Sequence, residues 1–292
     1  MQHPLWYKFL ALNSPAFCSY GFHRYSRSQG PGFCSAVLFT PLSKPARGLV
    51  VFLHGAGNDF LFPNLSLFRR LLLEGYIVFS FNGDGHGRED STLLHPERFT
   101  SSVADALSHA QHFAPHLPLF LVGHSLGGAL IFNYLAQESL KKIAKAVVIS
   151  TPLTVTGIEI AFIKEGKSLL CPDLYAQLFL YGFYGLIPSF GVFKRRDFPV
   201  RFDPAILSQK HHSIFAISRW LYSHLELETK LPLIQTPVLL AYGSWDALAP
   251  LSHGQQISSL LPSSQLLSVS HGTHFTTLFS PKTENTLVEW LQ

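Results

Sequence analysis

The sequence lacks the features that identify several large classes of protein. Only 14% of its 292 residues are charged, and the formal net charge is +4. The longest cluster of basic residues is the tripeptide at 194–196, so no basic stripe predicts binding to nucleic acid. No stretch of about 18 uncharged apolar residues occurs, which excludes an ordinary transmembrane helix. Hydrophobic residues make up 47% of the chain, and this is enough apolar material for a large core.

Cysteine is also scarce. The chain contains Cys18, Cys34 and Cys171, with no CxxC pair and no spacing typical of a metal site. Cys18 and Cys34 could face each other across a hairpin, but two buried free thiols are the preferred interpretation. Free thiols favour a reducing compartment, and we therefore expect a cytoplasmic protein. The first 26 residues lack the basic start and the uninterrupted apolar run of a secretory signal.

Short apolar runs alternate with helical patterns along the first half of the chain. An antiparallel hairpin is predicted at 19–26 and 32–41. After it come buried strands at 48–55, 75–87 (with a Gly-rich loop), 117–125 and 144–151, separated by helical patterns at 62–75, 97–114 and 126–138. Strands that alternate with helices across short joints indicate a mostly parallel sheet with crossover helices on its faces, which is an α/β fold.

This alternation stops at residue 152. Residues 152–231 show no buried-strand pattern and contain many aromatic residues. The alternation then resumes with a strand at 236–246, a helix near 252–261, a last strand within 265–275 and a closing helix from about 281. We therefore expect one α/β core formed by residues 1–151 and 232–292, interrupted by an inserted helical cap at 152–231.

A candidate nucleophile lies where one predicted strand meets the next helix. Ser125 stands between Gly123 and Gly127 in a Gly-x-Ser-x-Gly pattern. A serine in such a sharp turn takes a strained conformation, and side chains two positions away on either side would clash. The turn would hold the hydroxyl above the carboxyl edge of the sheet, at the positive end of the following helix.

Five short motifs occur in one order along the chain: FLHGAG, DGHGRED, GHSLGG, GSWDALAP and SHGTHF. With them the chain resembles an α/β-hydrolase with an inserted cap, over essentially residues 32–292. It is similar to the monoglyceride-lipase-like and lysophospholipase-like serine esterases, which are serine aminopeptidase S33-type hydrolases. The resemblance implies a serine hydrolase that needs no cofactor and no metal.

The resemblance also implies the partners of Ser125. A serine hydroxyl needs a base to take its proton, and His274 follows the last predicted strand, where the family carries its histidine. His271 is the nearby alternative. Asp246 follows the strand before it and would hold the base in one tautomer. A turn or helix N-cap role for Asp246 is the alternative. The resulting order of serine, acid and histidine is the one expected for this fold.

The same turn predicts an oxyanion hole, the pair of backbone N–H groups that binds a developing negative charge. Leu126 would give one N–H group, and Ala56, in the loop after strand 48–55, would give the other. Nearby polar residues are interpreted as structural: His54, Asp84, His86 and His124. The glycine-rich stretches lack the Lys-Ser/Thr of a phosphate loop, and no HExxH motif occurs, so neither a nucleotide nor a metal is predicted.

The cap is expected to cover the active-site edge because it joins two strands that end there. Its aromatic residues, among them Phe179, Phe183 and Tyr184, form either an apolar wall for an acyl chain or the cap's own small core. The resulting hypothesis is hydrolysis of carboxylic esters, such as acyl-glycerols or lysophospholipid-like lipids, with peripheral lipid contact left open. A thioesterase, an aminopeptidase and a non-catalytic ligand-binding protein are the alternatives.

Overall fold

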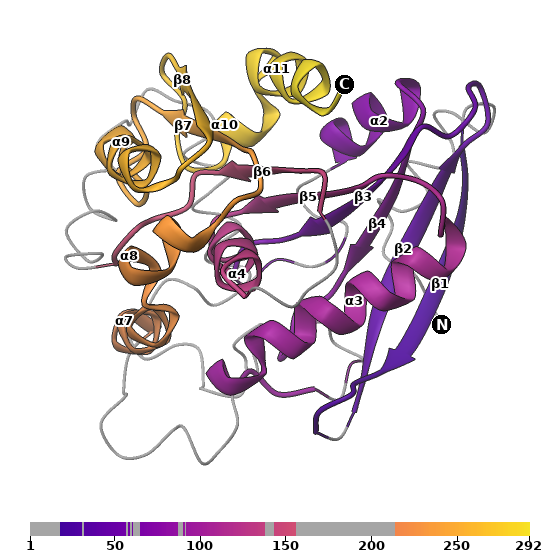
Figure 1. Ribbon diagram of the computed structural model, residues 1–292, viewed down its shortest axis with the longest axis horizontal. Coiled ribbons are helices and arrows are strands. Elements are labelled where there is room, and N and C mark those ends of the chain that lie inside the picture. Colours follow the sequence, from indigo (N-terminus) through magenta and orange to yellow (C-terminus); the bar gives the residue numbers. More distant parts are fainter. Residues whose placement is uncertain are drawn as a thin grey trace, which may run out of the picture.

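A computed structural model describes residues 18–30, 32–56, 58, 60, 65–86, 90, 92–137, 143–155 and 214–292. Its centre is an eight-stranded sheet in the order β1-β2-β4-β3-β5-β6-β7-β8 (Figure 1). The strands are β1 (Cys18–Ser26), β2 (Phe33–Pro41), β3 (Gly48–Leu53), β4 (Tyr76–Phe81), β5 (Leu119–His124), β6 (Lys145–Ile149), β7 (Val238–Gly243) and β8 (Ser264–Val269). β1, β2 and β4 pair antiparallel, and all other neighbours pair parallel.

The central strands consist almost entirely of apolar residues because both faces of the sheet are covered. Every residue of β3, β4, β5 and β7 is buried. In a parallel sheet with helices on both faces, side chains of both orientations enter a core, which removes the usual alternation of apolar and polar residues. The continuous apolar runs seen in the sequence are the consequence.

Helices cover the two faces of the sheet in two groups. Apolar residues of α2 (Leu65–Leu73), α10 (Thr276–Phe279) and α11 (Pro281–Leu291) belong to one buried cluster. Apolar residues of α3 (Phe99–Phe113), α4 (Leu126–Leu135), α7 (Ile214–Leu225), α8 (Leu227–Lys230) and α9 (Leu251–Leu260) belong to the other. Figure 1 shows α2 and α11 on one side of the sheet and α3 and α4 on the other. The predicted α/β class, a mostly parallel sheet between helices, is confirmed.

The sheet continues across the predicted insertion. β6 and β7 pair directly in parallel, from Ala146 beside Val238 to Ile149 beside Ala241. Of the predicted cap, the structure describes only 152–155 and 214–231, the second of which contains α7, α8 and the 3₁₀ turn η3 (Leu231–Leu233). Phe179, Phe183 and Tyr184 lie outside the described residues, so the cap and its aromatic wall stay predictions.

Several local features differ from the sequence expectation. The last strand ends at Val269, and a short helix, α10, follows the loop that contains His274. A 3₁₀ turn, η1 (Pro96–Arg98), precedes α3. In the hairpin, Cys18 lies beside Pro41 and Cys34 beside Tyr25, so the two cysteines do not face each other. Both are free thiols; Cys34 is buried as expected, Cys18 is half-buried, and Cys171 is outside the described residues.

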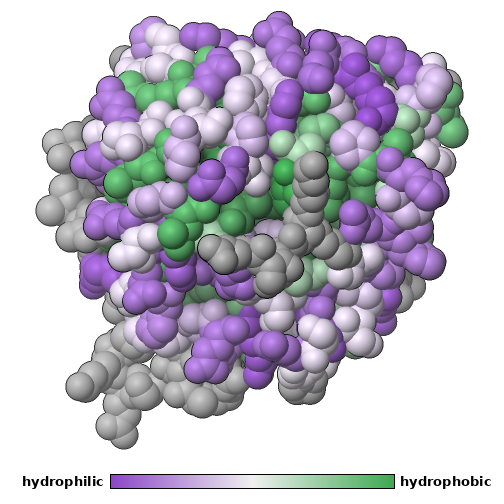
Figure 2. Space-filling model, in the orientation of Figure 1, coloured by the Kyte–Doolittle hydropathy of each residue, from purple (hydrophilic) through white to green (hydrophobic). Residues whose placement is uncertain are grey.

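The surface of the described part is mixed in character. Figure 2 shows hydrophobic residues gathered in a band across the middle of the face seen in Figure 1, with hydrophilic residues above and below it. The described chain exposes the following large apolar side chains, of which Tyr20 and Phe22 contact each other on β1: Tyr20, Phe22, Leu42, Phe113, Leu233, Trp245 and Phe279. None of the described helices has the length and hydropathy needed to cross a bilayer.

Candidate active site

Ser125 occupies the sharp turn between β5 and α4. Its backbone has φ 53° and ψ −119°, a conformation that L-residues rarely adopt outside special turns. The flanking glycines permit the turn because neighbouring backbone fills the space that a side chain would need. A Cβ at Gly127 would lie 2.1 Å from the Leu53 carbonyl oxygen, and a Cβ at Gly123 would lie 2.7 Å from the Gly127 carbonyl carbon.

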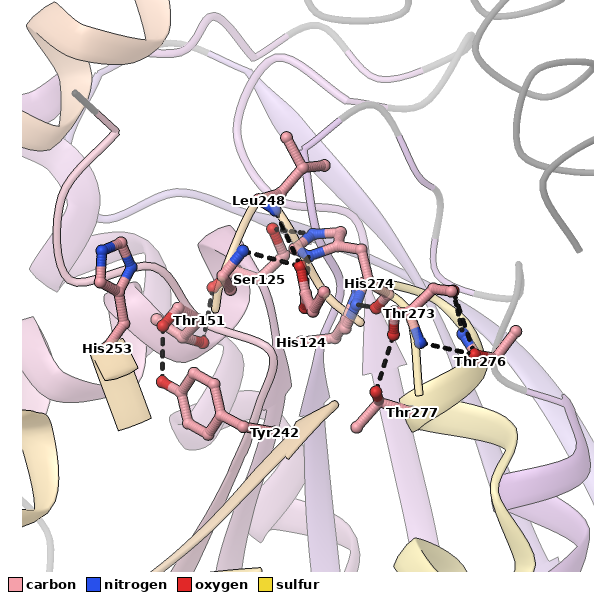
Figure 3. A network of polar contacts seen from close by, with 12 residues as sticks. His124, Ser125, Thr151, Tyr242, Leu248, His253, Thr273, His274, Thr276 and Thr277 are labelled. Atoms are coloured by element: carbon pink, nitrogen blue, oxygen red, sulfur yellow. Dashed lines mark hydrogen bonds and ion pairs between the residues drawn. The ribbon is translucent and has the colours of Figure 1, made fainter. Parts of the chain in front are cut away.

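His274 reaches Ser125 from the loop between β8 and α10 (Figure 3). Its Nε2 lies 3.0 Å from the Ser125 Oγ. The backbone of this loop is held from the nucleophile side as well, since the His124 Nε2 donates to the His274 carbonyl oxygen at 2.9 Å. The imidazole of His274 is almost fully buried, whereas Ser125 is half-buried and therefore partly accessible.

Asp246 lies on the other side of the His274 ring. The His274 Nδ1 is 3.0 Å from one carboxylate oxygen of Asp246 and 3.2 Å from the other. The carboxylate is fully buried and also accepts from the backbone N–H groups of Leu248 at 3.0 Å and Ala249 at 2.7 Å. Because an ionised carboxylate only accepts, the proton of a neutral His274 lies on Nδ1, and Nε2 is left as an acceptor for the Ser125 hydroxyl.

The loops that carry Asp246 and His274 are packed against each other. The Trp245 N–H donates to the Gly272 carbonyl oxygen at 2.9 Å, and a Cβ at Gly243 would lie 2.1 Å from that same oxygen. His271 is exposed and belongs to this contact. Its N–H donates to the Ser244 Oγ at 2.8 Å, and its ring centroid is 4.5 Å from that of Trp245. The structure therefore brings His274, and not His271, to the Ser125 hydroxyl.

The predicted oxyanion residues flank the nucleophile on two sides. Leu126 is the first residue of α4, so its N–H has no acceptor within the helix. Ala56 is exposed in the loop that follows β3. This loop lies directly against the nucleophile, since a Cβ at Gly55 would be 3.1 Å from the Ser125 Cβ. Ala56 therefore follows the residue at which this loop lies against Ser125.

His54 holds the loop after β3 to the loop after β4. Its Nδ1 donates to the Gly55 carbonyl oxygen at 2.8 Å, and its Nε2 accepts from the Gly83 N–H at 3.0 Å. Burial lowers the pKa of His54 to about 4. Burial, followed by the effect of nearby His274, lowers the pKa of His124 to about 3. Both rings are therefore neutral near pH 7, and the acceptor role of the His54 Nε2 requires this for His54.

Asp84 and His86 bond to structural groups around the loop after β4. The Arg27 guanidinium contacts one Asp84 carboxylate oxygen at 2.8 Å, and both side chains are buried. The His86 Nδ1 lies 3.0 Å from the Asp84 carbonyl oxygen, and its ring centroid is 4.8 Å from that of His54. These contacts agree with the structural roles expected for the two residues.

A small, largely apolar cavity is lined in part by Leu126. Residues of β3, β4, α3 and α4 and of the loops after β3 and β4 line it: Leu53, His54, Phe81, Gly83, Asp84, His86, Leu94, Phe99, Ser102, Leu126 and Leu130. Among the described residues, no group of three or more His, Cys, Asp and Glu side chains is arranged to hold a metal ion.

Two residues that the sequence did not single out lie near the site (Figure 3): Thr151, which contacts Ser125, and His253, which is close enough to Asp246 for the carboxylate to affect its pKa. The Thr151 Oγ1 donates to the Ser125 carbonyl oxygen at 2.9 Å. His253, in the first turn of α9, accepts from the Leu153 N–H through Nδ1 at 3.4 Å. Burial lowers the pKa of His253, and the nearby Asp246 carboxylate opposes that shift. No motif marks either residue, because both contacts depend on how the loops meet in three dimensions.

The chain matches one family model and is similar in sequence to several known proteins. A family model described as "Serine aminopeptidase, S33" matches residues 44–278. A monoglyceride lipase homolog of Monkeypox virus is 26% identical over 222 residues, which are 73% of this chain and 75% of that protein. The monoglyceride lipase of Homo sapiens is 29% identical over 225 residues, which are 72% of this chain and 70% of that protein.

Solved structures share the fold at lower sequence identity. An esterase from Pyrococcus furiosus superposes with a TM-score of 0.64 and 15% identity, covering 100% of this chain and 94% of that one. An esterase from Thermogutta terrifontis superposes with a TM-score of 0.61 and 15% identity, covering 93% of this chain and 98% of that one. At such identity the likeness concerns the fold alone.

Proposed function

Because this chain belongs to the serine aminopeptidase S33 family, we propose that it is a serine hydrolase that cleaves carboxylic esters through an acyl-enzyme. The expected resemblance to monoglyceride-lipase-like α/β-hydrolases is confirmed by the relatives it matches. The observation that carries the proposal is the continuous chain of contacts from Asp246 through His274 to Ser125, with heavy-atom separations of 3.0 Å on both sides of the imidazole.

In the proposed reaction, the Ser125 Oγ attacks the ester carbonyl carbon while the His274 Nε2 takes the hydroxyl proton. The carbonyl oxygen becomes an oxyanion, which the N–H groups of Leu126 and Ala56 would bind. Asp246 stabilises the imidazolium that forms and keeps it in place. The C–O bond to the alcohol then breaks, and the leaving alkoxide takes the proton from His274. An ester between the acyl group and Ser125 remains.

Deacylation repeats the same steps with water as the nucleophile. His274 accepts a proton from the water as its oxygen bonds to the acyl carbon, and a second oxyanion forms at the same N–H groups. Collapse breaks the bond to Ser125, which regains its proton from His274, and the carboxylic acid leaves. The sum is one ester and one water converted to one acid and one alcohol, with no electron transfer.

Apolar residues near Leu126 favour a substrate whose acyl group is a hydrocarbon chain. Leu126, a proposed oxyanion donor, is also among the residues that line the small cavity described above, and most of the others are aliphatic or aromatic. An acyl chain that extends from the Ser125 hydroxyl over apolar residues gains about 0.8 kcal/mol for each methylene that it buries. We assign acyl-glycerols as the substrate class, as the names of the matched monoglyceride lipases suggest, and lysophospholipid-like esters as a second candidate because they also join an acyl chain to a glycerol hydroxyl.

The test is hydrolysis of p-nitrophenyl esters from acetate to palmitate, together with a monoacylglycerol and a lysophospholipid. The wild-type protein is expected to turn over esters, and Ser125→Ala is expected not to. Absence of turnover at every chain length would refute the esterase assignment. A thioester and an amino-acid p-nitroanilide in the same panel distinguish a thioesterase and an aminopeptidase. If a fluorophosphonate probe failed to label the folded wild-type protein, a ligand-binding role would replace catalysis.

We also propose a cytoplasmic location, which the free thiols of Cys18 and Cys34 support. Cell fractionation tests it, and recovery of the protein outside the cytoplasm would contradict it.

A further inference from the structure

The hydroxyl of Thr151 makes a contact with the nucleophile that the mechanism above does not use. Thr151 lies two residues after the end of β6 and is fully buried. Its Oγ1 donates to the backbone carbonyl oxygen of Ser125 at 2.9 Å, and Figure 3 shows it lying between Ser125 and Tyr242. We propose that Thr151 is a positioning residue for the oxyanion hole, which it orients through the peptide group that joins Ser125 to Leu126.

The argument starts from the geometry of that peptide group. The Ser125 carbonyl and the Leu126 N–H belong to one planar trans peptide unit, so they point in opposite directions and cannot rotate independently. Any donor that fixes the carbonyl therefore fixes the N–H as well. The Leu126 N–H is the proposed oxyanion donor, and this inference rests on that part of the proposed function.

Three donors converge on the Ser125 carbonyl oxygen. Besides Thr151, the N–H groups of Gly128 and Ala129 donate to it at 3.0 Å and 3.3 Å as α4 begins. The N–H groups of Gly128 and Ala129 belong to α4, whereas Thr151 lies in the loop after β6 and adds a constraint that α4 alone does not provide. Hydrogen bonds to a carbonyl also polarise its peptide group, which makes the attached N–H a stronger donor.

The glycine pair of the GHSLGG motif explains how Thr151 comes this close. Gly127 is required by the turn itself, but Gly128 lies one residue beyond it. A Cβ at Gly128 would be 2.0 Å from the Thr151 Oγ1 and 2.7 Å from the Val148 Cγ1. A residue with a side chain at 128 would therefore displace the threonine hydroxyl from the Ser125 carbonyl.

A second layer of contacts fixes Thr151 itself. The Tyr242 hydroxyl, on β7, donates to the Thr151 carbonyl oxygen at 2.5 Å. Tyr242 is fully buried, and burial raises its pKa well above the ordinary value, so the hydroxyl keeps its proton and remains a donor. The contacts thus run from β7 through Thr151 to the nucleophile turn. They connect the strand that leads to Asp246 with the turn that carries Ser125.

The test compares Thr151→Val, which keeps the shape and removes the hydroxyl, with Thr151→Ser, which keeps the hydroxyl. Loss of one supporting hydrogen bond is expected to lower kcat for a p-nitrophenyl ester by about tenfold in the valine variant, with KM changed by less than about twofold. The serine variant is expected to stay within about threefold of wild type in kcat. Thr283→Val is the matched control, because this buried hydroxyl on α11 has no hydrogen-bond partner among the described residues.

A trifluoromethyl ketone inhibitor separates positioning from general stability, since its adduct with the serine carries an oxyanion. Thr151→Val is expected to weaken this inhibitor by about tenfold, in step with the fall in kcat. Equal kcat and equal inhibitor affinity in the wild-type and valine variants would overturn the inference while leaving the esterase intact. A similar loss in Thr151→Val and Thr151→Ser would also overturn it. A wild-type protein without ester turnover and without fluorophosphonate labelling would overturn both the inference and the proposed function.

Discussion

Acidification from pH 7 to pH 5 is expected to destabilise the folded protein through two buried histidines. Burial lowers the pKa of His54 from 6.5 to about 4 and that of His124 from 6.5 to about 3. Each folded-state pKa is below the unfolded value, so protons bind preferentially to the unfolded chain as the pH falls. The contribution of these histidines to stability is therefore complete above about pH 6.5 and declines below it.

The size of the loss in unfolding free energy follows from how far the pH falls below the unfolded-state pKa of each histidine. At pH 5 both rings are still neutral in the folded protein and charged in the unfolded chain. One pH unit corresponds to about 1.36 kcal/mol, so a fall of about 1.5 units below the unfolded pKa costs each histidine about 2 kcal/mol. Together the two histidines lower the unfolding free energy by roughly 4 kcal/mol at pH 5. This is a large share of the about 5–15 kcal/mol unfolding free energy typical of a folded domain. Other histidines with lowered pKa values act in the same direction.

Urea unfolding at pH 7, 6 and 5 measures this loss, and His124→Gln isolates one half of the pair. A glutamine amide can replace the His124 Nε2 as donor to the His274 carbonyl oxygen but does not titrate. The decrease in unfolding free energy between pH 7 and pH 5 is expected to be about 2 kcal/mol smaller in the variant than in the wild type. An equal decrease in both proteins, or a wild-type stability that is the same at the two pH values, would refute this reasoning.

Three further predictions concern the active site. Ser125→Ala and His274→Ala are each expected to lower kcat by about 10³-fold or more, and Asp246→Asn by somewhat less; esterase assays that show near wild-type rates in any of the three would contradict the assigned roles. His271→Asn, which tolerates the positive φ of this position, is expected to change kcat by less than about threefold. A loss equal to that of His274→Ala would transfer the role of base to His271. Incubation with a strong chelator is expected to leave the rate unchanged, since the proposed steps use only side chains and backbone N–H groups. A loss that added metal restores would argue for a metal-dependent reaction.

The order of strands and helices was predictable from the sequence because a strand buried on both faces appears as a continuous run of apolar residues. β3, β4, β5 and β7 consist almost entirely of apolar residues, and the sharp Gly-Ser-Gly turn marks where β5 ends. Asp246 and His274 follow successive strands β7 and β8, which pair in parallel. Carboxyl ends of parallel strands meet at one edge of a sheet, and for this reason the sequence could place both side chains near Ser125.

Other features depend on tertiary contacts that leave no local pattern. The position of β4 between β2 and β3 follows from strand pairing and not from chain order. Thr151 resembles any threonine at the end of a buried strand, and its hydroxyl gains a role only because Gly128 lets it approach Ser125. His271 and His274 lie in the same short motif, and the backbone path between them decides which imidazole points at the nucleophile.

The central claim is that Ser125 carries the acyl group between the two half-reactions. Mass spectrometry of the protein, quenched in acid during turnover of a slowly deacylated ester, measures this directly. The expected result is a mass increase equal to the acyl group on the peptide that contains Ser125, absent from the Ser125→Ala variant. Ester turnover with no such adduct, or with the acyl group on another residue, would contradict the account.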